Sequence, residues 1–117
     1  MNSARDVRLR LDDIMRGSEH IAELVARGRE VCESDWVLES ALIHELTMIG
    51  EACAGLPGEV CGEYPEVPWR DIVAMRNELI HRYFGVDFEE IWVTATRDVP
   101  ALLAQVKDIM AGLPPDE

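Results

Sequence analysis

Basic residues are scarce in this chain of 117 residues: 11 lysines and arginines stand against 23 aspartates and glutamates, a formal net charge of −12. A surface with this charge repels polyanions at long range, so we do not expect non-specific binding of nucleic acids. A small local nucleic-acid site and a basic protein partner are both compatible with it.

Long apolar runs and cysteine pairs are also missing. No eighteen apolar residues follow one another, which excludes a membrane-spanning helix, and the opening MNSARDVRLR is too charged for a signal peptide. The three cysteines, Cys32, Cys53 and Cys61, form no CxxC pair, so we expect neither a disulfide framework nor a zinc knuckle. These absences predict a cytoplasmic protein with reduced thiols.

The sequence contains no HExxH metal motif, no glycine-rich phosphate loop and no serine nucleophile elbow. His44 and Glu51 are seven residues apart and share a helix face, but two ligands do not make a metal site. We therefore expect no metal and no cofactor. His20 is expected on the surface, and His44 is expected to be partly buried in a helix.

No segment alternates with the period of a strand, whereas helical spacing of apolar residues is extensive. In residues 4–27 the apolar side recurs every three or four positions and stops at Gly28; its members are Val7, Leu11, Ile14, Ser18, Ile21 and Val25. A second helix follows Ser34, a candidate N-cap, and runs to about residue 55. The proline-rich stretch 56–68 is expected to be a non-helical connection.

The third helix is expected from Trp69 to Gly85, and Asp87 with Glu90 predicts a capping box for the fourth. Pro100 should kink or restart that fourth helix, with Asp98 as a local cap, and residues 112–117 should fray. Together these signals predict one all-α domain over residues 1–117. Its fold is an antiparallel bundle of four main helices, with one extra short helix at 29–33 as an option.

An arginine stands where the third helix should be apolar. The apolar positions Ile72, Val73, Leu79 and Ile80 define one side of this helix, and at about 100° per residue Arg76 falls in its middle. One interpretation is a buried structural ion pair of Arg76 with Glu45 or Glu51, which would stabilise little after desolvation. The other is a functional cation at a surface that meets a partner.

Asn77, His81 and Tyr83 accompany Arg76 in the stretch RNELIHRYFGVD. Tyr83 lies about 20° from Arg76 on an ideal helix, but His81 lies about 140° away, so one straight helix cannot direct Arg76 and His81 to one point. Either the helix loosens near His81, or a second copy of the protein supplies the complementary half of a site. The second alternative also explains an arginine within an apolar side.

Four stretches, RLRLDDI, MIGEA, YPEVPWRDIVAMRNELIHRYFGVD and DVPALLAQV, resemble the HepT-like toxins of the HEPN superfamily, and with the helix order the likeness covers nearly the whole chain. The Arg-x4-His-x-Tyr signature of that family falls on Arg76, His81 and Tyr83. The resemblance implies a homodimer with a shared cleft, in which Arg76 and His81 are the catalytic pair and Asn77 a supporting polar residue.

The resemblance further implies an endoribonuclease that needs no metal and a nucleotidyltransferase antitoxin that attaches adenylate to Tyr83, using ATP and Mg²⁺ itself. The residue types suit that chemistry: RNA carries its own 2′-hydroxyl nucleophile, histidine can transfer protons near neutral pH, and the arginine fork matches phosphate oxygens. The alternatives are a non-catalytic helical subunit of a nucleotidyltransferase complex and a purely structural helical dimer. The intact Arg–His–Tyr set favours the enzyme, and the acidic surface favours the subunit.

Overall fold

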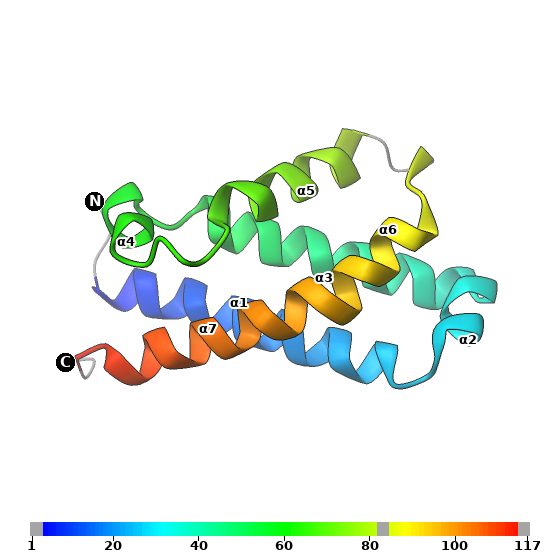
Figure 1. Ribbon diagram of the computed structural model, residues 1–117, viewed down its shortest axis with the longest axis horizontal. Helices are drawn as coiled ribbons and strands as arrows, with labels where there is room; N and C mark the ends of the chain where they lie inside the picture. The colour runs from blue at the N-terminus through cyan, green and yellow to red at the C-terminus, as the bar shows by residue number, and fades with distance from the viewer. Residues whose placement is uncertain (1–3, 82–84, 115–117) are drawn as a thin grey trace.

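A computed structural model describes residues 4–81 and 85–114 of the chain (Figure 1). Every regular element in these ranges is helical: α1 (Ala4–Val25), α2 (Arg29–Ser34), α3 (Trp36–Ala54), α4 (Gly58–Glu63), α5 (Trp69–His81), α6 (Phe88–Val93), the π-helix η2 (Thr94–Asp98) and α7 (Val99–Gly112). In the described part of the chain, no helix is long and apolar enough to cross a membrane.

Four long helical units make up the bundle, because α6, η2 and α7 follow one another without a break (Figure 1). The helix α3 lies at the centre, with α1 and α7 on one side of it and α5 on the other. The all-α bundle expected from the sequence is therefore confirmed, and α2 is the short extra helix expected at 29–33. Because α5 packs chiefly on α3, much of its surface stays open to solvent.

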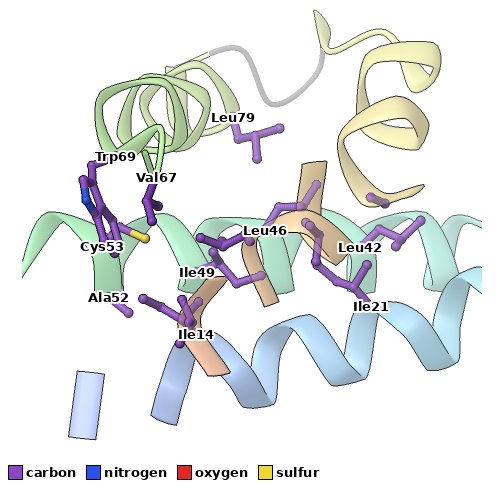
Figure 2. Close-up of a cluster of buried hydrophobic side chains, with 14 of the residues drawn as sticks. Ile14, Ile21, Leu42, Leu46, Ile49, Ala52, Cys53, Val67, Trp69 and Leu79 are labelled. Atoms are coloured by element: carbon purple, nitrogen blue, oxygen red, sulfur yellow. The ribbon is translucent and has the colours of Figure 1, made fainter. Parts of the chain in front are cut away.

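The core lies where α1, α3 and α7 meet, and Figure 2 shows the centre of this cluster together with Leu79 of α5, which points toward α3. The expected apolar side of α1 is buried except for Val25, which is half-buried. Each fully buried leucine or isoleucine contributes about 1.5–3 kcal/mol relative to an exposed one. The fully buried large side chains are Leu11, Ile14, Ile21, Leu42, Leu46, Ile49, Ile91 and Val106.

The end of α1 and the Asp87 cap of α6 match the sequence signals, whereas the start of α3 does not. Gly28, after α1, has φ 94°, a conformation that favours glycine, and the Asp87 side chain accepts from the Glu89 N–H to cap α6. The expected cap at Ser34 is wrong: Asp35 caps α3 by accepting from the Val37 N–H at 2.9 Å. The Ser34 hydroxyl instead donates to the Val31 carbonyl and so closes α2.

The connection at 56–68 is not wholly non-helical, because it contains α4. Pro57 precedes the first residue of α4, a place where its missing N–H breaks no helical bond. Val60 and Cys61 of this helix pack partly against the core. The packing of these two side chains therefore stabilises a short helix in a segment whose proline and glycine content favours a turn.

Pro100 lies in the first turn of α7, where the continuous helix changes from π- to α-helical, and the expected cap is absent. Pro100 has no N–H to donate to the carbonyl four residues earlier, and the turn before it is the π-helix η2. Asp98 makes no capping bond; its carboxylate accepts from Arg97 Nε at 2.9 Å. The Asp98 side chain therefore binds Arg97 and does not cap α7.

Candidate active site

Arg76 lies where α5 approaches α3 most closely, directly over Gly50. A Cβ atom built on Gly50 would lie 2.2 Å from Arg76 Cβ and 2.6 Å from Arg76 Cγ. Such distances do not occur between real side chains, so only glycine at position 50 permits this contact. The aliphatic part of the arginine therefore fills the apolar side of α5, and no charge lies in its middle.

The guanidinium of Arg76 reaches the edge of the α3–α5 contact and binds Glu51. Arg76 Nη1 lies 2.9 Å from Glu51 Oε1, and the two side chains are 19% and 50% exposed. Of the two carboxylates considered from the sequence, the partner is Glu51, because Glu45 Oε2 lies 3.1 Å from Nδ1 of the exposed His20. Arg76 Nε is buried and has no hydrogen-bond partner among the described residues. One donor of the guanidinium is thus unused.

Asn77 and His81 are both exposed on α5, on a side different from that of Arg76. On an ideal helix they lie within about 40° of each other, but His81 lies about 140° from Arg76. The chain remains α-helical through His81, so α5 does not loosen before it. Within one copy of the described chain, Arg76 and His81 are therefore not directed to a common point.

The third member of the sequence signature, Tyr83, lies outside the described residues. Nothing in the described ranges bears on its role, which stays a prediction.

Apolar and polar residues along one edge of the α3–α5 contact, most of them exposed, form what we term the α3–α5 face. The exposed positions of α3 follow the four-three spacing of a single helix side, and ideal helix geometry places them on the same side of the contact as Asn77 and Ile80. This spacing of exposed residues on α3 is present in the sequence but was not among the predicted site features. The α3–α5 face consists of Val37, His44, Met48 and Glu51 from α3 and Val73, Asn77 and Ile80 from α5.

On its other side, α5 borders an acidic cleft toward α6 and η2. This cleft encloses about 390 Å³ and has an apolar floor that includes Leu46 and Leu79, with Glu78, Glu89 and Glu90 at its rim. The one arginine in this lining, Arg97, is paired with Asp98, so among the described residues the cleft offers phosphate no unpaired cation beside its carboxylates and does not suit RNA. The α3–α5 face is the better candidate surface for a polyanion.

The cysteines do not provide a nucleophile. Burial raises the pKa of Cys53 to about 12, and burial also raises the pKa of Cys32 and Cys61. All three thiols are therefore protonated at neutral pH, in the unreactive form.

Across residues 4–81 and 85–114, no three histidine, cysteine or acidic side chains are grouped to hold a metal ion. His44 is exposed, so its expected partial burial is wrong.

Comparison with known proteins adds an independent finding. Residues 14–109 match the family model described as Ribonuclease HepT-like. The chain is 40% identical over 96 residues to a "Probable ribonuclease HepT" of Thermococcus cleftensis, covering 79% of this chain and 84% of that protein. It is 40% identical over 101 residues to a "Putative RNase TTE0752" of Caldanaerobacter subterraneus, covering 86% of this chain and 90% of that protein. No solved structure gives a significant match.

Proposed function

This chain belongs to the HepT-like ribonuclease family, and we propose that it cleaves RNA without a metal ion, in a cleft shared by two copies, with Arg76 and His81 as the catalytic pair. The observation that carries the proposal is the setting of Arg76. A guanidinium that is packed over Gly50 and paired with the half-exposed Glu51 lies at the edge of an exposed face that also presents Asn77. A phosphate of RNA would bind this guanidinium in place of the Glu51 carboxylate.

The reaction we propose is an in-line transfer to the neighbouring 2′-hydroxyl. One imidazole of His81 takes the 2′-hydroxyl proton as O2′ attacks phosphorus, and the bond from phosphorus to the 5′-oxygen breaks. The leaving oxygen takes a proton from a protonated imidazole, which the second copy of His81 can supply. Arg76 stabilises the negative charge of the phosphorane. The products are a 2′,3′-cyclic phosphate and a free 5′-hydroxyl.

This function is tested by incubating a mixed-sequence RNA with the purified protein in EDTA. We expect cleavage to persist in EDTA, to leave cyclic phosphate ends, and to be absent from a DNA strand of the same sequence. Cleavage that EDTA abolishes would show that a metal is required and would contradict the mechanism.

A homodimer through the α3–α5 face is part of the proposal, because His81 and Arg76 of one copy point in different directions. Met48 and Ile80 are 43% and 49% exposed on this face, where a second copy would cover them. We expect Ile80→Asp to convert a dimer at micromolar concentration into a monomer and to abolish cleavage. Sedimentation velocity measures the first effect.

The matched control is Leu9→Asp on α1, 52% exposed and away from this face, which should remain dimeric. A wild-type protein that is monomeric at this concentration would refute the shared cleft.

We further propose that the chain is the toxin of a toxin–antitoxin pair and is silenced when a nucleotidyltransferase partner attaches adenylate to the Tyr83 hydroxyl. The partner transfers AMP from ATP with loss of pyrophosphate, and the phosphodiester anion on Tyr83, seven residues after Arg76 in the sequence, then competes with RNA. A phenol with a pKa near 10 is a poor base at neutral pH, so we assign Tyr83 control and not catalysis.

Co-expression with the nucleotidyltransferase encoded beside this chain tests the assignment of Tyr83. We expect an added mass of one adenylate on the Tyr83 peptide, and a Tyr83→Phe protein that stays toxic but escapes silencing. Loss of toxicity in Tyr83→Phe would make the residue catalytic or structural instead.

A second candidate function is a non-catalytic helical subunit of a nucleotidyltransferase complex. The ion pair between Arg76 and Glu51 favours it, since Glu51 already neutralises the cation. Formation of the complex without RNA cleavage by the chain alone, and without growth arrest on its expression, would support this alternative.

A further inference from the structure

Polar and charged side chains of α5 lie on different sides of the helix. Arg70, Asn77 and His81 lie at intervals of seven and four residues, within about 40° of one another on an ideal helix. Of the two carboxylates of the helix, Glu78 lines the cleft toward Thr94 and Arg97, whereas Asp71 lines a cleft on that side and also one that it shares with Arg70. A chain of phosphates that runs from Arg70 toward Asn77 and His81 would therefore lead away from Asp71.

Arg70 and Asn77 also line one open concavity, of about 430 Å³, between α5 and the end of α3. Its remaining walls are apolar side chains and thiols, namely Cys53, Ala54, Cys61, Trp69, Val73 and Ala74. A hollow with an apolar wall, one amide and one guanidinium offers separate surfaces to a base or ribose and to a phosphate.

The guanidinium of Arg70 is available for a ligand. Arg70 is exposed and has neither an ion pair nor a hydrogen bond with any residue in the two described ranges. Four other arginines are held by carboxylates: Arg16 by Asp12, Arg29 by Glu33 and Glu89, Arg76 by Glu51, and Arg97 by Asp98. Arg70 therefore lies on the same side of α5 as Asn77 and His81. No described carboxylate of the chain would compete with a phosphate for its guanidinium.

We propose that Arg70 binds a phosphate of the RNA strand next to the one that is cut, and that the concavity beside it holds the adjoining nucleotide. The inference rests on the proposed ribonuclease function. The rise of an α-helix places Arg70 about 9 Å from Arg76 and about 16 Å from His81 along the axis, so the two arginines engage different phosphates. Arg70 is a substrate-binding residue: it fixes the register of the strand, while Arg76 and His81 perform the chemistry.

Binding of an all-2′-O-methyl RNA oligonucleotide, which resists cleavage, tests this assignment without relying on activity. With Arg70→Gln we expect about tenfold weaker binding, and a slope of log K against log salt that is smaller by about 0.7, the value for one phosphate of a single strand. Arg70→Lys should restore the slope, because it restores the charge. The control is Arg27→Gln, an exposed cation in the turn between α1 and α2, which should bind like the wild type; α2 and α4 lie at opposite ends of the bundle (Figure 1).

In the cleavage assay the same Arg70→Gln substitution should raise KM more than it lowers kcat. Equal affinity and equal salt slope for wild type and Arg70→Gln would overturn the assignment, and so would a wild-type protein that does not bind the oligonucleotide. A wild-type protein that binds the oligonucleotide but cuts no RNA refutes the ribonuclease proposal alone, because the comparison of affinities still decides the role of Arg70.

Discussion

Replacing His81 by alanine should lower the rate of RNA cleavage by about 10²- to 10⁴-fold, the usual contribution of a general acid–base group. Arg76→Ala should lower it by about 10²- to 10³-fold, the loss expected when one donor to a developing oxyanion is removed. His81 is exposed at the end of α5, so His81→Ala should fold and melt like the wild type. Steady-state cleavage of a fluorescent RNA, with kcat and KM measured separately, gives both effects.

The other two histidines are matched controls for this prediction. His20 pairs with Glu45 on the surface, and His44 is exposed on α3. His20→Ala should retain activity within about twofold, as expected for a surface residue outside the reaction. His44 lies in the proposed dimer interface, so His44→Ala should be compared at a protein concentration at which the dimer is complete. If His81→Ala and Arg76→Ala cleave as fast as the wild type, the assignment of the catalytic pair is wrong.

Gly50→Ala should be strongly destabilising. The new Cβ would lie 2.2 Å from Arg76 Cβ, an atom that cannot rotate away, so α5 must shift off α3. We expect the free energy of unfolding to fall by about 3 kcal/mol, the upper end of the cost of overpacking, and the melting temperature to fall by about 10 °C or more. Thermal and urea denaturation measure both. Alanine is otherwise the better helix former by about 0.5–1 kcal/mol, so destabilisation here must come from the contact.

Gly62→Ala is the control, because a Cβ at that position of α4 meets no heavy atom within 4 Å. It should leave stability unchanged or raise it by about 0.5 kcal/mol. Combining Gly50→Ala with Arg76→Gly removes the colliding Cβ and should cost less than the sum of the two single changes. A Gly50→Ala protein as stable as Gly62→Ala would mean that α3 and α5 do not meet at this point.

The helices of the bundle could be predicted because their signals are local. The spacing of Leu11, Ile14 and Ile21 marks the buried side of α1, and the Asp87 cap marks the start of α6. The short helix α4 could not be predicted, since its proline and glycine content favours a turn while its formation depends on the core contacts of Val60 and Cys61. The cap of α3 was misplaced by one residue because serine and aspartate are equally good caps.

The site was predictable as a set of residues but not as a geometry. The sequence placed Arg76 on the apolar side of α5, but Glu45 and Glu51 both remained possible partners. The choice between them depends on how α5 packs on α3. That packing depends on the close contact between Gly50 and Arg76, which the spacing of apolar residues in the sequence does not reveal. Whether His81 meets Arg76 depends in turn on a second copy of the chain, a contact that no pattern within one chain specifies.

The central claim, that the RNA supplies its own nucleophile, is tested most directly by one substitution in the substrate. An RNA oligonucleotide that the protein cuts at one linkage is resynthesised with a single 2′-deoxynucleotide on the 5′ side of that linkage, and cleavage is measured in EDTA. The mechanism predicts that cutting at this linkage disappears while other linkages are cut as before. Cleavage of the 2′-deoxy linkage at the original rate would contradict it, because the phosphorus would then be attacked by water or by a protein group.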